Sequence, residues 1–169
     1  TKFLGHNANH ALLGYLAREQ GLRFMHEAGE REDLMTIVQE AFLEESGVGL
    51  RHKYAELDDD LFTEDGFRAY AEDAVTRMVS PFLRDPVDRV TRDPARKLGW
   101  EDRLVGSMRL ASEAGVKPNR LARGVAIALQ CLCEETGQGD PEVLLAELWK
   151  DAAGELSADL LKLVFNSII

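Results

Sequence analysis

Apolar residues recur along almost the whole chain at the spacing of an amphipathic α-helix. Leu34, Ile37, Val38, Ala41 and Phe42 follow the i, i+3, i+4, i+7, i+8 pattern that places apolar side chains on one face of a helix. The same pattern occurs between residues 67 and 78 and between residues 161 and 168. No run of alternating apolar and polar residues is bounded by turn signals, as a half-buried strand requires. The sequence therefore predicts an all-α, multi-helix fold.

Polar caps and glycines predict several helix boundaries. Thr63 precedes the second of these apolar patterns as a suitable N-cap, and Asp140 followed by Pro141 is typical of a helix start. We expect the helix after Asp140 to end at Gly154, and the last helix to begin at Ser157. Two further signals predict the end of one helix at Gly115 and the start of the next after Pro118.

Charge and cysteine content exclude several classes of protein. The chain has 169 residues and a formal net charge of −10, which argues against a general binder of nucleic acid or anionic membranes. No stretch approaches the roughly 18 apolar residues that a membrane span requires. The two cysteines, Cys131 and Cys133, favour a reducing cytoplasm over a disulfide framework. They lie about 200° apart around a helix, so we expect buried thiols that do not share a metal ion.

The segment from residue 81 to residue 97 breaks the helical pattern. Its three prolines, Pro81, Pro86 and Pro94, rule out one continuous helix. Five basic residues between positions 84 and 97 outnumber three acidic ones, so this stretch is positive within an acidic chain. It is a candidate anion site, and paired surface charges of little energetic consequence are the alternative. The basic residues are Arg84, Arg89, Arg92, Arg96 and Lys97.

Polar residues gather at the start of the chain, on a helix expected from Asn7 to about residue 20. Asn7, His10 and Gly14 fall within about 60° of one another around this helix, beside its apolar face. Lys2 precedes the helix on a lead-in that we expect to be extended. The alternative is an ordinary N-terminus, in which Asn7 caps the helix and His10 is a surface residue. His6 and His10 have a metal-compatible i, i+4 spacing, but no third ligand lies close in sequence, so we predict no metal site.

Other candidate motifs carry no function in the sequence. Gly47-Val48-Gly49 begins like a dinucleotide-binding glycine motif, but His52 stands where the third glycine belongs. A helix, and not a strand, is expected before it, so the chain has no visible nucleotide-binding fold. The many carboxylates lie along helix faces, and we expect them to be solvated.

Two blocks of residues resemble the mannitol dehydrogenase family of polyol-specific long-chain dehydrogenases and reductases. The first block is Lys2-x4-Asn7-x2-His10 at the head of a helix. The second runs from Arg89 to Leu98 and continues with Asp102-Arg103-Leu104-Val105-Gly106 and Gly115-Val116-x-Pro118. The likeness extends in order over most of the chain, which makes it more specific than either block alone.

The resemblance implies a domain organisation. In this family an N-terminal Rossmann domain binds NAD, and a helical C-terminal domain of the kind found in 6-phosphogluconate-dehydrogenase-like enzymes supplies the substrate side. Residues 1–169 resemble that second domain, and the chain opens at Thr1 without an initiator methionine. We therefore expect the NAD-binding domain to be a partner that this chain lacks, and the chain alone to be catalytically inactive.

The resemblance also implies catalytic roles. Lys2 would exchange a proton with a secondary alcohol, Asn7 would donate a hydrogen bond to the same oxygen, and His10 would orient the substrate. No metal is needed, because the lysine does the acid–base work. Two departures from the family pattern are His6, where relatives usually have a small or apolar residue, and Asn9, where they often have glycine.

The positive segment would hold the far end of the substrate. Arg89 and Lys97 match family positions with that role, and Arg92 and Arg96 would join them around a phosphate, because a guanidinium can hold two phosphate oxygens at once. We therefore expect NAD-dependent interconversion of mannitol 1-phosphate and fructose 6-phosphate. A relative acting on free mannitol or a hexuronate is one alternative, and a helical adaptor without catalytic activity is another.

Overall fold

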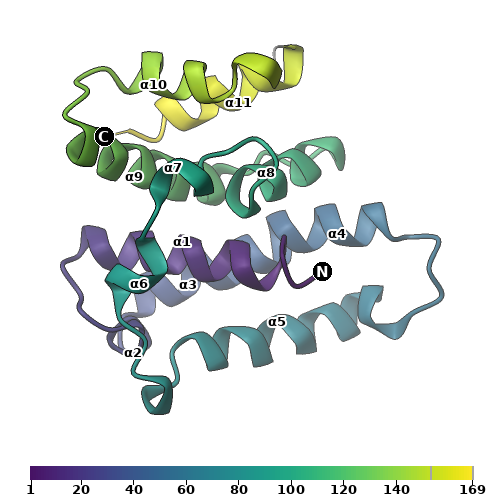
Figure 1. Ribbon diagram of the computed structural model, residues 1–169. Helices are drawn as coiled ribbons and strands as arrows, with labels where there is room; N and C mark the ends of the chain where they lie inside the picture. The colour runs from purple at the N-terminus through teal and green to yellow at the C-terminus, as the bar shows by residue number, and fades with distance from the viewer. Residues whose placement is uncertain (153, 169) are drawn as a thin grey trace.

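The computed structural model describes residues 1–152 and 154–168, and its regular elements are helices (Figure 1). One isolated bridge between Phe24 and Pro86 is the extent of β-pairing within those ranges, so the all-α prediction is confirmed. The longer helices are α1 (His6–Glu19), α5 (Glu64–Met78), α8 (Arg103–Glu113), α9 (Asn119–Thr136) and α11 (Glu155–Phe165). The shorter ones are α2 (Met25–Ala28), α3 (Glu32–Glu40), α4 (Gly47–Lys53), α6 (Val87–Thr91), α7 (Pro94–Lys97) and α10 (Pro141–Leu148).

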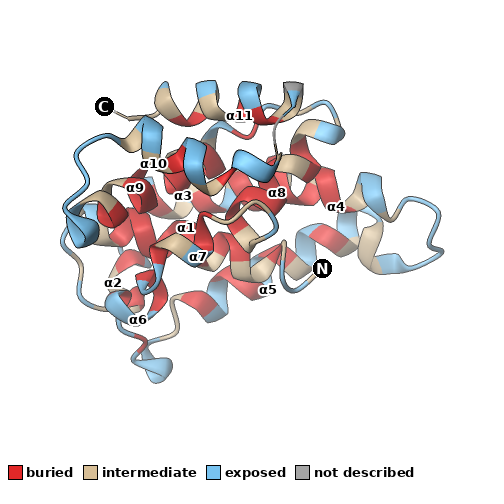
Figure 2. Cartoon of the chain, turned by 45° about the horizontal axis from the view of Figure 1, so that its top comes forward, coloured by how far each residue is buried: buried red, intermediate tan, exposed pale blue. Residues whose placement is uncertain are grey.

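The helices stack in tiers. In Figure 1, α10 and α11 lie on α8 and α9, which lie in turn on α1 and the α3–α4 pair, with α5 on the opposite side. A π-helical segment, Ala41–Ser46, joins α3 to α4. Short α6 lies beside α1, and short α7 lies beside α8 and α9 (Figure 1). An apolar cluster extends through the tiers from Ala11 to Val164. Figure 2 shows the buried residues concentrated where the helices face one another. None of the helices in the described ranges is long and apolar enough to cross a membrane.

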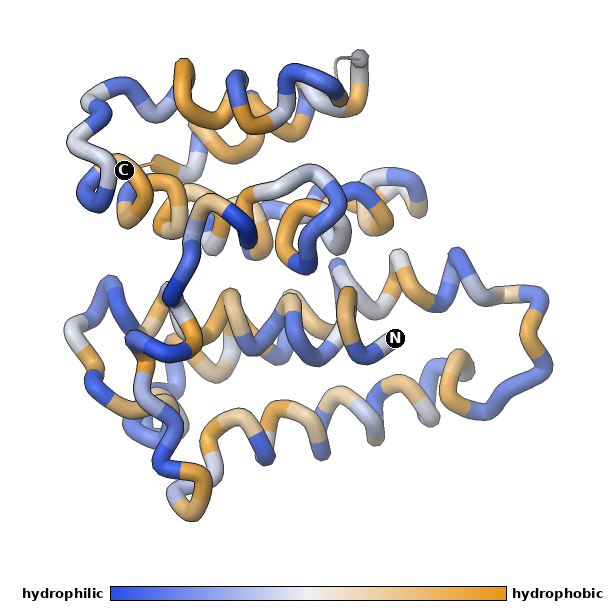
Figure 3. The backbone as a smooth tube through the Cα atoms, viewed as in Figure 1, coloured by the Kyte–Doolittle hydropathy of each residue, from blue (hydrophilic) through white to orange (hydrophobic). Residues whose placement is uncertain are grey.

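Helix α1 lies at the centre, in contact with α3, α5, α6, α8 and α9. Its residues 11–17 are all buried, whereas His6, Asn7 and His10 remain partly accessible. Figure 3 shows apolar residues recurring along the helices between hydrophilic stretches, which is the pattern that drives this stacking. The accessible face near the start of α1 is thus the one that carries His6, Asn7 and His10.

Several predicted helix boundaries are confirmed. Thr63 Oγ1 accepts a hydrogen bond from Gly66 N at 3.1 Å at the start of α5, and Asp140 Oδ1 accepts one from Glu142 N at 3.0 Å at the start of α10. Gly115 follows α8 with φ of +81°, a left-handed conformation that glycine adopts without strain. The prolines of residues 81–97 do divide that stretch, into a 3₁₀ turn at Pro81–Leu83 followed by α6 and α7.

The predicted end of one helix at Gly154 and the predicted start of the last helix at Ser157 are wrong. Helix α10 ends at Leu148, and the indole of Trp149, its C-cap residue, donates to Leu98 O at 2.7 Å. Gly154 is instead the N-cap of α11, which begins two residues before the predicted Ser157. Ser157 lies inside the first turn, where its hydroxyl oxygen accepts from Gly154 N at 3.0 Å.

The predictions for the start of α1 also need correction. Helix α1 begins at His6 with Gly5 as N-cap, so Asn7 lies inside the helix and does not cap it. The lead-in is turned and not extended, since Gly5 N donates to Thr1 O at 2.7 Å and Asn7 N donates to Lys2 O at 2.9 Å.

Of the two cysteines, Cys131 is buried as predicted, whereas Cys133 is only partly buried. Gly47-Val48-Gly49 lie within α4, which confirms that they form no phosphate-binding turn after a strand.

Candidate active site

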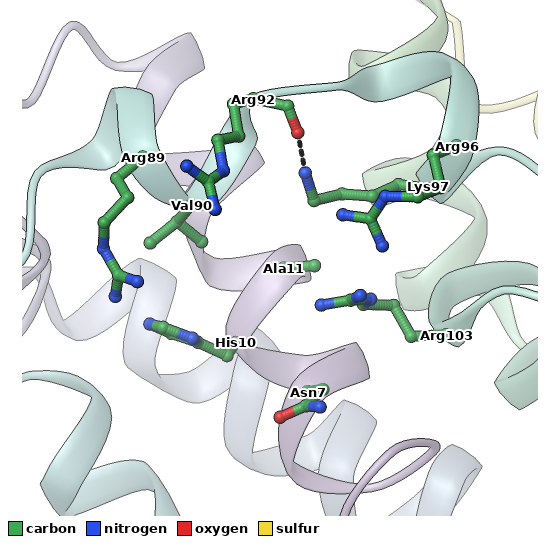
Figure 4. A pocket seen from close by; sticks show the side chains of 9 residues that line it. All are labelled: Asn7, His10, Ala11, Arg89, Val90, Arg92, Arg96, Lys97 and Arg103. Atoms are coloured by element: carbon green, nitrogen blue, oxygen red, sulfur yellow. Dashed lines mark hydrogen bonds between the residues drawn. The ribbon is translucent and has the colours of Figure 1, made fainter.

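A cavity of about 220 Å³, open to solvent, lies between α1, α6, α7 and the start of α8 (Figure 4). It brings together six of the seven residues that the sequence nominated, drawn from both blocks of the resemblance. The exception is Lys2, which is exposed and does not line the cavity. The lining residues are Asn7, His10, Ala11, Arg89, Val90, Arg92, Arg96, Lys97 and Arg103.

A close approach of α6 to α1 builds one wall. A Cβ placed on Gly14 would lie 2.5 Å from Val90 Cγ1, so only glycine allows the two helices to meet there. The Tyr15 hydroxyl then donates to Thr91 O at 3.0 Å and holds the end of α6 on α1. As a result, the basic residues on and after α6 face Asn7 and His10, which precede Gly14 on α1 (Figure 4).

Lys97 is the most enclosed of the basic residues, with 3% of its surface exposed. Its Nζ donates to the backbone oxygen of Arg92, as Figure 4 shows. Burial, with Arg96 and Arg103 nearby, lowers the pKa of Lys97 to about 8. Among the described residues, no carboxylate oxygen lies within 4 Å of the Lys97 amine or the Arg92 guanidinium.

Three carboxylates compensate the other cations. Arg89 forms a bidentate pair with Asp85, with both N–O distances at 2.5 Å. Arg96 contacts Asp93 at 2.7 Å and Asp102 at 3.4 Å. Arg103 contacts Asp102 at 2.9 Å. The two interpretations of the positive segment therefore apply to different members: some form ion pairs, whereas Arg92 and Lys97 keep an uncompensated charge beside the cavity.

His10 lines the cavity, and its buried Nε2 lies 3.4 Å from Asp85 Oδ2 without a hydrogen-bond partner in the described residues. Burial lowers the pKa of His10 to about 4, although the Asp85 charge acts in the opposite direction. The imidazole is therefore neutral near pH 7, with one nitrogen as donor and the other as acceptor.

Lys2, His6 and Arg84 lie outside the cavity. Lys2 is on the turn before α1, and burial together with the nearby Lys2 charge lowers the pKa of His6. The rings of His6 and His10 are 6.0 Å apart, and no cluster of three metal-ligating side chains occurs in residues 1–152 and 154–168. Arg84, counted in the positive segment, is exposed and does not line the cavity.

Two residues of the site were missed by sequence reasoning. Arg103 carries no functional signal in the sequence beyond its place in the second block, yet it lines the cavity from the first turn of α8, and its guanidinium carbon lies 5.2 Å from the Phe3 ring centre. Asp85, a carboxylate that the sequence predicts to be solvated, is instead buried beside Arg89 and His10. The i, i+4 spacing of Asp85 and Arg89 is a local signal for their ion pair, although it does not indicate that Asp85 is buried.

Comparison with known proteins identifies the family of this chain. The family model described as mannitol dehydrogenase C-terminal domain matches residues 1–159. A mannitol-1-phosphate 5-dehydrogenase of Bacillus licheniformis is 38% identical over 138 residues, covering 82% of this chain and 34% of the relative. Those of Caldanaerobacter subterraneus subsp. tengcongensis and Bacillus subtilis are 37% and 35% identical, covering 73% and 82% of this chain and 30% and 33% of the relatives. The chain thus spans about one third of the length of these curated relatives.

Proposed function

The chain belongs to the mannitol dehydrogenase C-terminal domain family, and from that premise we propose that it is the substrate domain of an NAD-dependent enzyme that interconverts mannitol 1-phosphate and fructose 6-phosphate. The observation that carries the proposal is the cavity itself. It places an amide and an imidazole from α1 opposite basic residues from α6, α7 and α8.

The charge of the cavity supports a phosphorylated substrate. Five basic residues line it, and three carboxylates pair with them, which leaves two positive charges. A phosphate monoester carries a charge of about −2 near neutral pH, so it matches this excess. We place the phosphate near Arg92 and Lys97, whose charges are not compensated, and the reacting carbon near Asn7 and His10.

The residues of this chain do not fit a dinucleotide. The described ranges contain helices and no strand–turn–helix unit, so we assign the coenzyme mainly to a separate Rossmann domain. When bound there, NAD supplies the acceptor for the hydride. The cavity is small for a ligand pocket, since typical ones are about 300–1,000 Å³, which suits a site completed by a second domain.

Proton transfer is assigned to the start of the chain. In the proposed reaction, Lys2 takes the proton from the secondary alcohol during oxidation and returns it to the alkoxide during reduction. Asn7 donates its side-chain N–H to the same oxygen as negative charge develops there, and His10 hydrogen-bonds a neighbouring hydroxyl. The hydrogen bond from Asn7 N to Lys2 O ties the lysine one turn before the amide, which supports their joint action.

Steady-state kinetics of the intact protein tests the substrate. We expect NAD-linked oxidation of mannitol 1-phosphate with a kcat/KM at least a hundredfold above that for mannitol, because free mannitol leaves Arg92 and Lys97 without an anion. Equal efficiency on mannitol, or preference for a hexuronate, would remove the phosphate assignment. No turnover of any of the three would favour a non-catalytic helical adaptor.

Lys2→Ala tests the acid–base role in the same protein. General acid–base catalysis contributes roughly 10²–10⁴-fold, so kcat should fall by at least a hundredfold while the affinity for NAD stays unchanged. Lys53→Ala, which removes another exposed lysine, is the matched control. An undiminished kcat in Lys2→Ala would exclude this lysine as the proton acceptor and leave the substrate assignment standing.

A further inference from the structure

Asp85 joins two residues of the cavity although it does not line the cavity itself. Its side chain is 6% exposed. Oδ1 accepts from Arg89 Nε, and Oδ2 accepts from Arg89 Nη2, both at 2.5 Å. The same Oδ2 lies 3.4 Å from the buried Nε2 of His10, a separation at which no hydrogen bond is formed, and Nε2 has no other partner among the described residues. One carboxylate therefore holds a residue of α6 and faces a residue of α1.

The backbone of Asp85 is fixed from an independent part of the chain. Met25 N donates to Asp85 O at 2.9 Å, and Val87 N donates to Arg23 O at 3.0 Å. These bonds flank the isolated bridge between Phe24 and Pro86, so they pin residues 85–87 to the loop before α2. The backbone of Asp85 is thus fixed by contacts that involve neither Arg89 nor His10, as expected of a group that positions others.

We propose, building on the proposed function, that Asp85 is a positioning residue that fixes the tautomer of His10 and the direction of the Arg89 guanidinium. A carboxylate accepts hydrogen bonds only, so the imidazole nitrogen that faces it, Nε2, carries the proton. Nδ1 is then the acceptor left for a ligand. His10 would accordingly accept a hydrogen bond from a substrate hydroxyl, and donate none to it.

The ion pair between Asp85 and Arg89 also sets the charge distribution of the cavity. Asp85 compensates Arg89, so the guanidinium beside His10 acts as a neutral pair, and the net positive charge lies with Arg92 and Lys97. An uncompensated Arg89 would attract the phosphate toward the catalytic end. Asp85 therefore discriminates between the two ends of the substrate, and its loss should favour binding in the reversed, unproductive orientation.

Asp85→Asn is the informative change, because asparagine keeps the shape and removes the acceptor-only chemistry. With its oxygen near Arg89 Nε, the asparagine NH₂ faces His10 Nε2 and forces the proton onto Nδ1. With the oxygen near His10, the NH₂ faces Arg89 Nε, donor against donor. Neither orientation satisfies both partners. Asp85→Glu keeps the charge and the acceptors, and Asp88→Asn removes an exposed carboxylate of the same segment as the control.

The experiment uses the intact protein that carries this chain. We expect Asp85→Asn to lower kcat/KM for mannitol 1-phosphate about a hundredfold, mostly through kcat, since misplacement of reacting groups by about 1 Å costs that much. Asp85→Glu should recover at least a tenth of the lost activity, and Asp88→Asn should match the wild type. A loss in Asp85→Asn that equals the fraction of unfolded protein, with no change per folded molecule, would overturn the proposal.

A spectroscopic readout separates this proposal from the proposed function. With ¹⁵N-labelled histidine, the His10 signals should report a proton on Nε2 in the wild type and on Nδ1 in Asp85→Asn. The charged or titratable groups that face His10 are Asp85, His6, Arg89 and Arg103, and only Asp85 changes between these samples. An unchanged tautomer refutes the positioning role even if the enzyme is active. A switched tautomer in a protein without dehydrogenase activity refutes only the proposed function.

Discussion

Two buried carboxylates, Glu45 and Asp85, each pair with an arginine, and they differ in what else they contact. Glu45 is 0% exposed in the π-helical segment Ala41–Ser46, and its two oxygens accept from the backbone N–H groups of Arg120 and Leu121, at 2.9 and 3.0 Å. These groups open α9, so Glu45 caps that helix from a distant part of the sequence. Asp85 instead contacts side chains that line a cavity.

The comparison shows how a structural ion pair differs from one that serves a site. Every strong contact of Glu45 points into the scaffold, where Arg120 also binds Glu40 at 2.6 Å and Glu44 at 3.0 Å. Asp85 instead contacts Arg89 and His10, which line the cavity and have further polar atoms that a ligand could meet. Burial alone therefore does not identify a functional carboxylate. What distinguishes the two is whether the groups that the carboxylate contacts belong to the scaffold or line the cavity.

The largest effect that the comparison predicts is on stability. Glu45→Ala removes a helix cap and one partner of a buried ion pair, and breaking such a pair costs about 3 kcal/mol or more. The free energy of unfolding in urea should fall by that amount. Catalytic activity per folded molecule of the intact protein should not change, because Glu45 has no contact with the cavity.

Asp85→Asn is the counterpart, with a large loss of activity and a smaller loss of stability. If Glu45→Ala lowered activity per folded molecule as much as Asp85→Asn does, the distinction between the two carboxylates would be lost. Glu113→Ala, at the exposed end of α8, provides a control for the removal of a surface carboxylate.

The difference between these regions also explains what the sequence could predict. Local signals are enough for Thr63, Asp140 and the prolines of residues 81–97, because caps and breakers act on their immediate neighbours. The stripe of Asn7, His10 and Gly14 was predictable from helical geometry. Gly14 proved to be the point where Val90 packs, which no local pattern specifies.

Glu45 and Asp85 could not be identified as buried, because their environments are made by residues distant in sequence. Glu45 meets Arg120 and Asp85 meets His10 only after the tiers assemble. The resemblance supplied six residues that the fold does bring together, but it gave no reason to separate the compensated Arg89 from the uncompensated Arg92.

Acidification should affect the two regions with opposite signs. Burial raises the pKa of Glu45, so its contribution to stability is fully present below the unfolded pKa of about 4.5 and is lost as pH rises. Burial lowers the pKa of His10 to about 4, so its contribution is present above 6.5 and is lost as pH falls.

Between pH 7 and pH 5, the His10 contribution should therefore fall by about 2 kcal/mol. Urea unfolding of the wild type and His10→Gln at both pH values measures this, and the wild type should lose more stability than the variant. Relative to Glu45→Gln, which lacks a titrating carboxyl, the wild type should gain stability on acidification. The same pH dependence in all three proteins would mean that neither group has the environment described here.

The smallest predicted effect separates the two kinds of arginine within the cavity. Arg92 has no carboxylate partner within 4 Å in the described residues, so Arg92→Gln should raise the KM for mannitol 1-phosphate about tenfold through loss of one charge-assisted hydrogen bond. Arg96 is held by Asp93 and Asp102 and is about half exposed, so Arg96→Gln should change KM by less than about threefold. The KM for NAD should stay constant in both variants, because the residues lie at the phosphate end.

Raising the salt concentration should reduce the Arg92 effect, since screening weakens an interaction at an open cavity. Equal KM values for the two variants would show that carboxylate pairing does not decide which guanidinium meets the substrate.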